Sequence, residues 1–322
     1  MKPEPVLTQM PPHVKEKIVD LLNTDSKMIM RLCTKDFKEQ VDHSSIHFDS
    51  VYIKLSHQSV AITVIFAITG ICGSGCTGKE IENYATEKEN GHFIDEAVTA
   101  LTTILKNPRF TFGSLIFKLH WTREFKFFER FLSADRSRFV EHFIKNLEGR
   151  LIPTKELWFS THGADSERNL FKVLGTLKPG FLKSMTLKSW MKMYLHPVAE
   201  MEQFRMAKSL DIEGIELQSP FTVAKWSSFK YVRMKIQMFD LAMMNEIIEM
   251  FRTSPTIQEA HLALHDLNYQ GTEEQLEPFI HGDPKKSQYV IPGEQDRLEI
   301  FFSGWRFDVK KMKNNVEEFF DD

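Results

Sequence analysis

Apolar side chains recur at intervals of three and four residues near the start of the chain, at Val14, Ile18, Leu21 and Leu22. This is the spacing of one face of a helix. Polar residues interrupt the pattern at 23–26, and two more short helices are predicted, one over 26–32 and one beginning near Phe37. Because helices this short bury little surface on their own, the segment 10–43 is predicted to dock on a partner.

Beyond this segment the pattern changes to short runs rich in Val, Ile, Phe and Leu, which predict strands. The runs are SVYIKL, VAITVIFAI, SLIFKLHW, ELWFS, SMTLKS, SLDIEG, YVRMKIQ, EAHLALHD and RLEIFF. From ELWFS to EAHLALHD their centres recur about every 22 to 30 residues, the period of a leucine-rich-repeat-like array. We therefore predict an α/β fold in which parallel strands form one wall of an irregular solenoid and helices form the other.

Stretches of helical period precede or separate these strands, at 93–105, 168–177, 197–208 and 240–252. Turn residues such as Pro179-Gly180 divide the units. Three regions are expected from this organisation. They are a small helical segment at 1–48, a strand pair with helices at 49–149 that caps the solenoid, and the repeat-like array at 150–322.

Alternate residues of a strand face opposite sides of its sheet, which separates core residues from outer residues in the array. In SMTLKS and YVRMKIQ the apolar residues are predicted to face the core, so Lys188, Arg233 and Lys235 face outward. SLDIEG adds Asp211 and Glu213 to that outer face. These five residues are either cross-strand ion pairs worth about 0.2–1 kcal/mol each, or a mixed-charge surface that binds a protein substrate.

Composition and charge disfavour several classes of partner. The 322 residues are 42% hydrophobic and carry a net charge of −3, with acids and bases interspersed. This distribution lacks the basic stripe of a nucleic-acid-binding protein. The longest uncharged apolar stretch, 60–72, is shorter than the roughly 20 residues that cross a bilayer, and the first residues lack the apolar core of a secretory signal. We therefore expect no nucleic-acid or membrane partner and a cytoplasmic and/or nuclear location.

The sequence GSGCTGK, from Gly73 to Lys79, has the spacing of a phosphate-binding loop. Glu80 stands where that motif requires a Ser or Thr hydroxyl for magnesium. The competing interpretation is a Gly-rich turn between two strands, since glycine tolerates positive φ. A nucleotide-binding protein that uses this loop is therefore the alternative function.

Other candidate chemistry is weaker. His261 and His265 have the spacing of a zinc-protease helix, but Leu262 replaces its general-base Glu and the local pattern is that of a strand. Cys72 and Cys76 lack further ligands at recognised offsets. We expect no catalytic residue, no metal site and no cofactor, and hence a protein that is not an enzyme.

The stretch MPPHVKEKIVDLLNTDSKMIMRLCTKDF, from Met10 to Phe37, resembles an F-box. That family's pattern opens with Leu-Pro, places Ile and Leu on its first helix, and continues Ser-Arg-Leu-x-Leu-Arg-x-Val-Cys-Lys-x-Phe. This chain departs from it by Met at three Leu positions, by Cys33 and by Thr34, which are shape-tolerant exchanges. The resemblance implies an apolar face that binds a Skp adaptor, formed by Met10, Pro11, Ile18, Leu22, Met28, Met30 and Phe37.

The remainder resembles the FTH domain that follows the F-box in the nematode-type F-box A family. The stretches that carry this resemblance are DEAVTALTTILKNPRFTF, LKPGFLKSMTLKS, AEMEQFRMAKSLDI and FKYVRMKI. It implies that 1–48 is the F-box, that 150–322 is the FTH domain, and that a Gly-Cys turn falls at Gly75-Cys76. The implied function is that of a substrate-recognition adaptor in a Skp, cullin and F-box type E3 ubiquitin ligase, with an unknown protein substrate. A non-catalytic scaffold that binds the adaptor and delivers no substrate is a further alternative.

Overall fold

The computed structural model divides within one strand, β5 (Thr154–Thr161), into two compact units, 1–157 and 158–322, each of which mixes helices and strands. The structure describes residues 10–22, 26–27, 30, 35–44, 46–55, 59–65, 78–85, 93–108, 110–119, 129–161, 165–189, 195–213, 223–236, 241–264, 287–291, 296–303 and 306–313. Both units belong to the α/β class that the sequence predicts.

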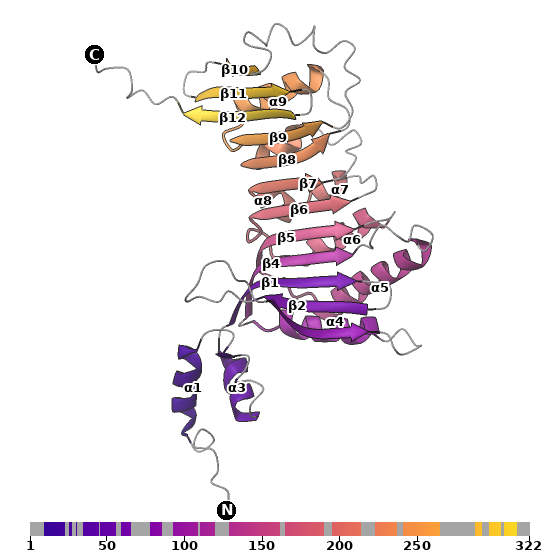
Figure 1. Cartoon of the computed structure of the whole chain (residues 1–322), viewed down its shortest axis with the longest axis vertical. Coiled ribbons are helices and arrows are strands. Elements are labelled where there is room, and N and C mark those ends of the chain that lie inside the picture. The colour runs from indigo at the N-terminus through magenta and orange to yellow at the C-terminus, as the bar shows by residue number, and fades with distance from the viewer. Residues whose placement is uncertain are drawn as a thin grey trace, which may run out of the picture. The chain divides into compact units, whose positions relative to one another are not determined.

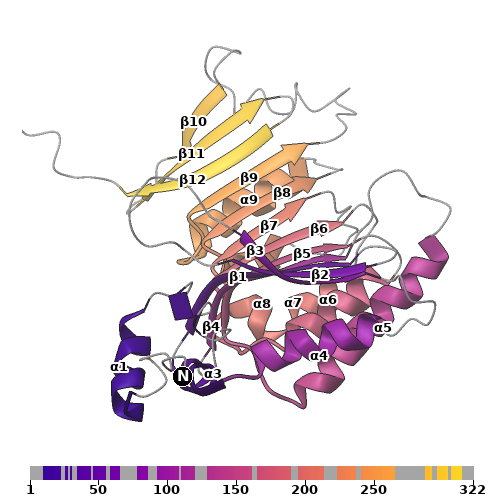
Figure 2. The ribbon, with the colours of Figure 1, turned by 60° about the horizontal axis from the view of Figure 1, so that its bottom comes forward.

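The first unit combines a pair of short helices with a sheet that carries helices on one face (Figures 1 and 2). Its elements are α1 (Pro12–Leu21), α3 (Lys35–His43), β1 (Ile46–Leu55), β2 (Ser59–Ile65), β3 (Gly78–Ala85), α4 (Phe93–Leu105), β4 (Phe110–Leu119), α5 (Glu129–Leu147) and the start of β5 (Thr154–Thr161). The strand order is β4-β1-β2-β3. The β1–β4 pair is parallel, whereas β1–β2 and β2–β3 are antiparallel.

The core of this unit lies between the sheet and helices α4 and α5. Phe117 of β4 meets Phe143 of α5 edge to face, with ring centroids 5.5 Å apart, a geometry that aromatic pairs favour. The strands approach closely at Gly113, where an added Cβ would lie 2.5 Å from the carbonyl oxygen of Asp49. A side chain at that position would therefore separate β1 from β4.

The second unit alternates strands with short helices and ends in an antiparallel group. Its elements after β5 are α6 (Ser166–Leu174), β6 (Ser184–Ser189), α7 (His196–Ala199), α8 (Glu202–Met206), β7 (Ser209–Glu213), η3 (Val223–Ser228), β8 (Tyr231–Ile236), α9 (Leu241–Thr253), β9 (Glu259–Leu264), β10 (Ser287–Ile291), β11 (Asp296–Ser303) and β12 (Arg306–Lys313). The order is β5-β6-β7-β8-β9-β12-β11-β10. Strands β6 to β9 pair in parallel, and β12 joins β9 antiparallel.

One backbone hydrogen-bond pattern recurs at the start of successive parallel strands. The carbonyl of Lys183 accepts from the amides of Lys208 and Ser209, and that of Lys208 accepts from Lys230 and Tyr231. The carbonyl of Lys230 then accepts from the amides of residues 258 and 259. The residue before each of these positions is buried: Leu182, Ala207, Phe229 and Ile257. The four segments LKSMTLK, AKSLDIE, FKYVRMK and IQEAHLA are thus equivalent, and this equivalence sets the register of their strands.

Helices α6, α7 and α8 cover one face of this sheet (Figure 2). The buried residues include Met185 of β6, Ile212 of β7 and Met234 of β8. Along each strand such buried residues alternate with residues that face outward, as the sequence predicts. Phe204 of α8 packs edge to face on Phe229, with ring centroids 5.0 Å apart. The opposite face of the sheet carries polar and charged residues.

Most predicted elements are present. The nine predicted strands correspond to β1, β2, β4 to β9 and β11, and the helix predicted over 93–105 has the bounds of α4. The single helix predicted over 197–208 is wrong: α7 and α8 are separate because Met201, with ψ 140°, adopts an extended backbone. Helix α5 and strands β10 and β12 were not predicted, whereas β3 is the second strand that the Gly-rich turn interpretation expects.

Candidate functional site

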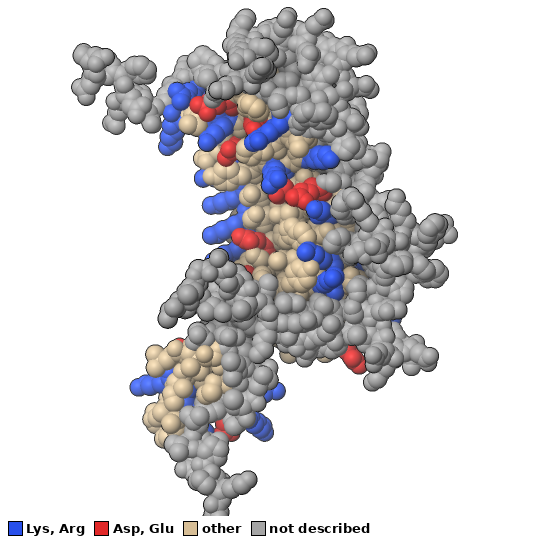
Figure 3. Space-filling view, in the orientation of Figure 1, with Lys and Arg blue, Asp and Glu red and all other residues tan. Residues whose placement is uncertain are grey.

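The outer face of the second unit's sheet carries rows of charged residues set by strand register. Parallel pairing places Lys188 beside Glu213, and Asp211 beside Arg233. Arg233 is also the register partner of His261 on β9. His261 in turn is the register partner of Asp308 on β12. Figure 3 shows the resulting face, on which basic and acidic side chains are interspersed.

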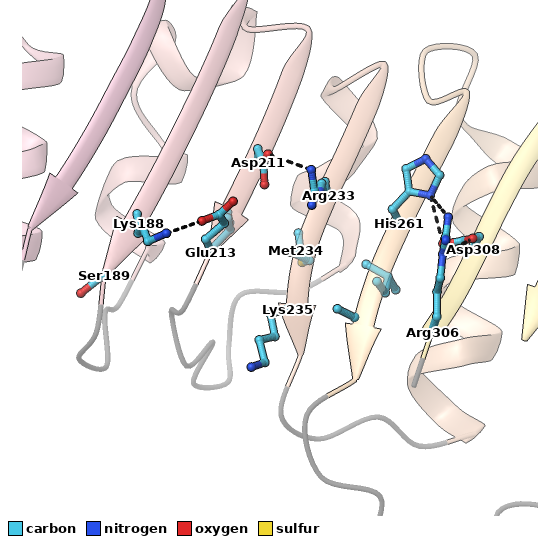
Figure 4. A pocket seen from close by; sticks show the side chains of 13 residues that line it. Lys188, Ser189, Asp211, Glu213, Arg233, Met234, Lys235, His261, Arg306 and Asp308 are labelled. Atoms are coloured by element: carbon cyan, nitrogen blue, oxygen red, sulfur yellow. Dashed lines mark hydrogen bonds and ion pairs between the residues drawn. The ribbon is translucent and has the colours of Figure 1, made fainter. Parts of the chain in front are cut away.

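A depression of about 660 Å³ lies over the carboxyl-terminal halves of β6 to β9 and the first residues of β12. Its lining contains all five outward-facing residues predicted from the sequence: Lys188, Asp211, Glu213, Arg233 and Lys235. Figure 4 shows these side chains on three adjacent strands, with His261, Arg306 and Asp308 on the next two. The alternation of the strand sequences therefore brings together the residues expected to share this face.

Two cross-strand ion pairs connect β6 to β7 and β7 to β8. Lys188 Nζ donates a hydrogen bond to Glu213 Oε2 at 2.7 Å. Arg233 and Asp211 are farther apart, with 3.8 Å between Nη1 and Oδ2, which is beyond a hydrogen bond. The first pair is well formed, and the second is a loose electrostatic contact.

The buried carboxylate of Asp211 has few favourable interactions to offset its loss of hydration. Its Oδ1 atom is buried and accepts no hydrogen bond from the described residues. Burial, and to a lesser degree the nearby Glu213 carboxylate, raises the pKa of Asp211, while Arg233 and Lys188 oppose that change. Folding therefore makes the ionised form of Asp211 less favourable than it is in the unfolded chain.

A second charged group surrounds His261 at the β9–β12 boundary. The two ring nitrogens lie 3.1 Å from Glu259 Oε1 and 3.0 Å from Asp308 Oδ1. The guanidinium of Arg306 donates to Asp308 from Nε, and this hydrogen bond raises the pKa of Arg306. His261 thus lies between two carboxylates, and His265, its partner in the zinc-protease spacing, lies outside the described residues.

The sequence pattern did not predict that Glu259, Arg306 and Asp308 belong to this charged group. Strand β12 follows β9 by more than 40 residues, and only antiparallel pairing brings Asp308 opposite His261. The alternation in RFDVKKMK, with Phe307 and Val309 buried, is the signal that could have predicted this strand.

The residues of the predicted adaptor face lie on or beside α1 and α3. Pro11 is the N-cap of α1, and Ile18 and Leu22 lie at its C-terminal end. Both are half-buried, as are Met10, which precedes the N-cap, and Met30. Met28 and the side chain of Phe37 lie outside the described residues. Val19 and Val41, which are fully buried, supply the core of this helix pair.

Only the end of the phosphate-loop sequence falls within the described residues. Gly78 and Lys79 lie on β3, where Lys79 pairs with Val64 of the antiparallel β2. A phosphate-binding loop leads into a helix whose N-terminus faces the phosphate. Here the residues after the loop form a strand, which favours the turn interpretation. Gly73 to Cys76, with the Gly-Cys turn, lie outside the described residues.

Comparison with known protein families gives a match to part of the chain. Residues 137–279 match the FTH domain, from within α5 to beyond β9, and so include the charged depression except for its β12 residues. No curated protein and no solved structure matches the chain. Among the described helices, none combines the length and the apolar character needed to cross a bilayer.

Proposed function

We propose that this protein is a substrate receptor of a Skp, cullin and F-box type ubiquitin ligase. In this proposal the F-box-like helices bind the Skp adaptor, and the FTH region, a leucine-rich-repeat-like solenoid, holds a protein substrate. The observation that carries the proposal is the order of the two segments: an F-box-like motif at 10–37 precedes an FTH domain at 137–279.

The packing of α1 on α3 supports an external partner for the motif residues. The small core of this pair uses Val19 and Val41, and buried Lys15 donates to Asp36 Oδ2 at 3.0 Å. Leu21 is 87% exposed, and its neighbours Ile18 and Leu22 are only half-buried. Large apolar side chains that stay exposed or half-buried in the unbound protein are typical of a binding surface.

The proposed role requires no catalytic residue in this chain. A receptor that binds both the ligase and a substrate raises the effective concentration of the substrate lysine near the charged conjugating enzyme. The FTH region would supply an extended sheet face for that substrate, as repeat proteins do. Ubiquitin transfer would then take place on other subunits of the complex.

Deletion of residues 1–43 tests the proposal. The full chain should co-purify with a Skp adaptor, and the deletion variant should not, while its thermal unfolding still shows a cooperative transition. A matched full-length variant, Glu16→Ala with Lys17→Ala, changes exposed polar residues of α1 and should bind normally. Unchanged co-purification of the deletion variant would remove the F-box assignment. Adaptor binding without ubiquitination of any co-purified protein would favour the scaffold alternative.

A further inference from the structure

The outer face of β8 carries three residues at alternate positions: Tyr231 and Arg233, which are exposed, and Lys235, which is half-buried. We propose that this face binds an extended acidic segment of a partner protein. The inference rests on the proposed function only in identifying that partner as the ligase substrate. The binding itself depends on the geometry of the second unit.

The depression contains both signs of charge, but its acids lie beneath its bases. The side chain of Arg233 is 69% exposed, against 26% for Asp211. The same order holds on β12, which β9 separates from β8: Arg306 is 55% exposed and Asp308 16%. Lys188 and Glu213 are the exception, at 30% and 43%, but they are joined by a short hydrogen bond. The charge that a ligand meets first over β8 and β12 is therefore positive.

Arg233 and Lys235 also retain unused hydrogen-bonding capacity. Among the described residues, Lys235 has no ion pair, and Figure 4 shows its side chain extending away from the pairs on neighbouring strands. The guanidinium of Arg233 lies 3.8 Å from the Asp211 carboxylate and so keeps its donors available. Both bases can meet a carboxylate of a ligand without first breaking a strong internal contact.

The spacing of these bases matches that of an extended peptide. Residues two apart on a strand are about 6.7 Å apart, and the same repeat separates side chains on one side of an extended ligand. A segment with Asp or Glu at alternate positions therefore places successive carboxylates over Arg233 and Lys235. Such a ligand gains two charge-assisted contacts from one strand of the sheet.

Tyr231 extends the same row by one position and adds an aromatic contact. It is exposed, and Lys230 Nζ lies 5.1 Å from its ring centroid. Tyr and Arg are enriched among the residues that dominate protein interfaces. The favoured ligand therefore has an apolar or aromatic residue beside its acidic positions.

Peptide binding to the full-length chain, without any Skp adaptor, tests this inference. The probe is a fluorescent peptide of about ten residues that alternates Glu and Thr, measured by anisotropy at about 50 mM salt, where surface charges are weakly screened. Arg233→Glu with Lys235→Glu should weaken its binding about tenfold or more. The milder pair Arg233→Ala with Lys235→Ala should weaken binding in the same direction, and it covers the case in which charge reversal disturbs folding.

A matched control keeps the same change in net charge at a different place. Lys183 and Lys208 are exposed and lie just before β6 and β7, at the opposite ends of the parallel strands. Lys183→Glu with Lys208→Glu should change peptide binding less than about twofold, because the contact with bound carboxylates is local. A peptide with Gln in place of Glu should bind the wild-type chain much more weakly.

Three results would overturn the inference: equal binding of the acidic peptide by the reversed and wild-type chains, equal binding of the Gln peptide, and stronger binding of a single-stranded oligonucleotide of similar charge. The last result would identify a nucleic-acid surface instead. Because the assay contains no Skp adaptor, its outcome is independent of the deletion of 1–43 that tests the proposed function. If the chain binds the peptide but no adaptor, this inference stands and the proposed function is wrong.

Discussion

The two candidate binding surfaces of this chain expose different chemistry. The α1–α3 pair presents apolar side chains such as Leu21, whereas the outer face of β6 to β9 presents charged residues that are largely paired with one another. Removing apolar area from water is favourable at any ionic strength, while contacts between exposed charges weaken with salt. The first surface therefore suits a stable subunit contact, and the second a reversible and selective one.

The two surfaces also differ in how they affect the stability of the folded, unbound protein. An exposed Leu21 changes the stability of its own helix little, because it contacts almost nothing there. Asp211, by contrast, lies partly desolvated under Arg233 with one oxygen unpaired, which is unfavourable for the unbound chain. Four sets of substitutions test this difference between the two surfaces.

Phe229→Ala should destabilise the second unit while leaving the first unit intact. Phe229 is fully buried against Phe204, and truncation of a buried Phe costs about 3–5 kcal/mol. Chemical denaturation should show an earlier transition, and binding of the acidic peptide should fall with it. Adaptor binding should persist, because the α1–α3 pair belongs to the first unit. Loss of adaptor binding in this variant would show that the two surfaces depend on each other.

Ile18→Ala with Leu21→Ala should abolish adaptor binding at low and high salt alike. Apolar residues at an interface centre contribute about 2 kcal/mol or more each when they are hot spots. Titration calorimetry of the double variant against a Skp adaptor measures the loss. The Glu16→Ala, Lys17→Ala variant is the control on the same helix. Strong salt dependence of wild-type adaptor binding would contradict the apolar assignment.

Lys188 and Glu213 should couple by about 0.2–1 kcal/mol in a double-mutant cycle of unfolding. Their 2.7 Å hydrogen bond and direct cross-strand register favour a value in the upper part of that range. The same cycle on Arg233 and Asp211, which lie 3.8 Å apart, should give a smaller coupling. Equal couplings would mean that the Arg233 contact is as well formed as the Lys188 contact, and Arg233 would then be less available to a ligand.

Asp211→Asn should stabilise the chain slightly at neutral pH, by about 0.5 kcal/mol, in the range of most surface substitutions. The pKa of Asp211 is raised on folding, so its favourable contribution is complete below the unfolded pKa and is lost as the pH rises through the folded pKa. The gain from Asn should therefore shrink as the pH falls from 7 toward about 3.5. Thermal unfolding of both chains across this range measures the trend. A gain that grows at low pH would contradict the burial of an ionised carboxylate.

Much of the second unit could be predicted because its strands are half-buried. Alternation in SMTLKS, SLDIEG and YVRMKIQ predicts which residues face the core, and the burial of Met185, Ile212 and Met234 confirms it. The regular return of these runs predicts parallel neighbours, which β6 to β9 are. The five predicted charges share one depression for that reason. Whether they bind a substrate stays a prediction.

Other features depend on contacts between residues far apart in the sequence. The helix pattern of 197–208 gave no sign of the extended residue Met201 that separates α7 from α8. Strand β12 reaches the site only by pairing with β9, and this pairing brings Arg306 and Asp308 to His261. The alternation in RFDVKKMK can predict a strand, but it does not specify that β9 is the partner of that strand.

Local pattern alone therefore determined the α/β class, the core-facing positions and the outward charges, because side-chain periodicity follows directly from strand and helix geometry. Tertiary structure decided which of those charges are covered and which are presented. Arg233 lies over Asp211, Arg306 lies over Asp308, and Lys235 extends away from its neighbours. Exposure depends on the neighbouring strands that pack around a side chain, and the sequence of one strand does not contain that information.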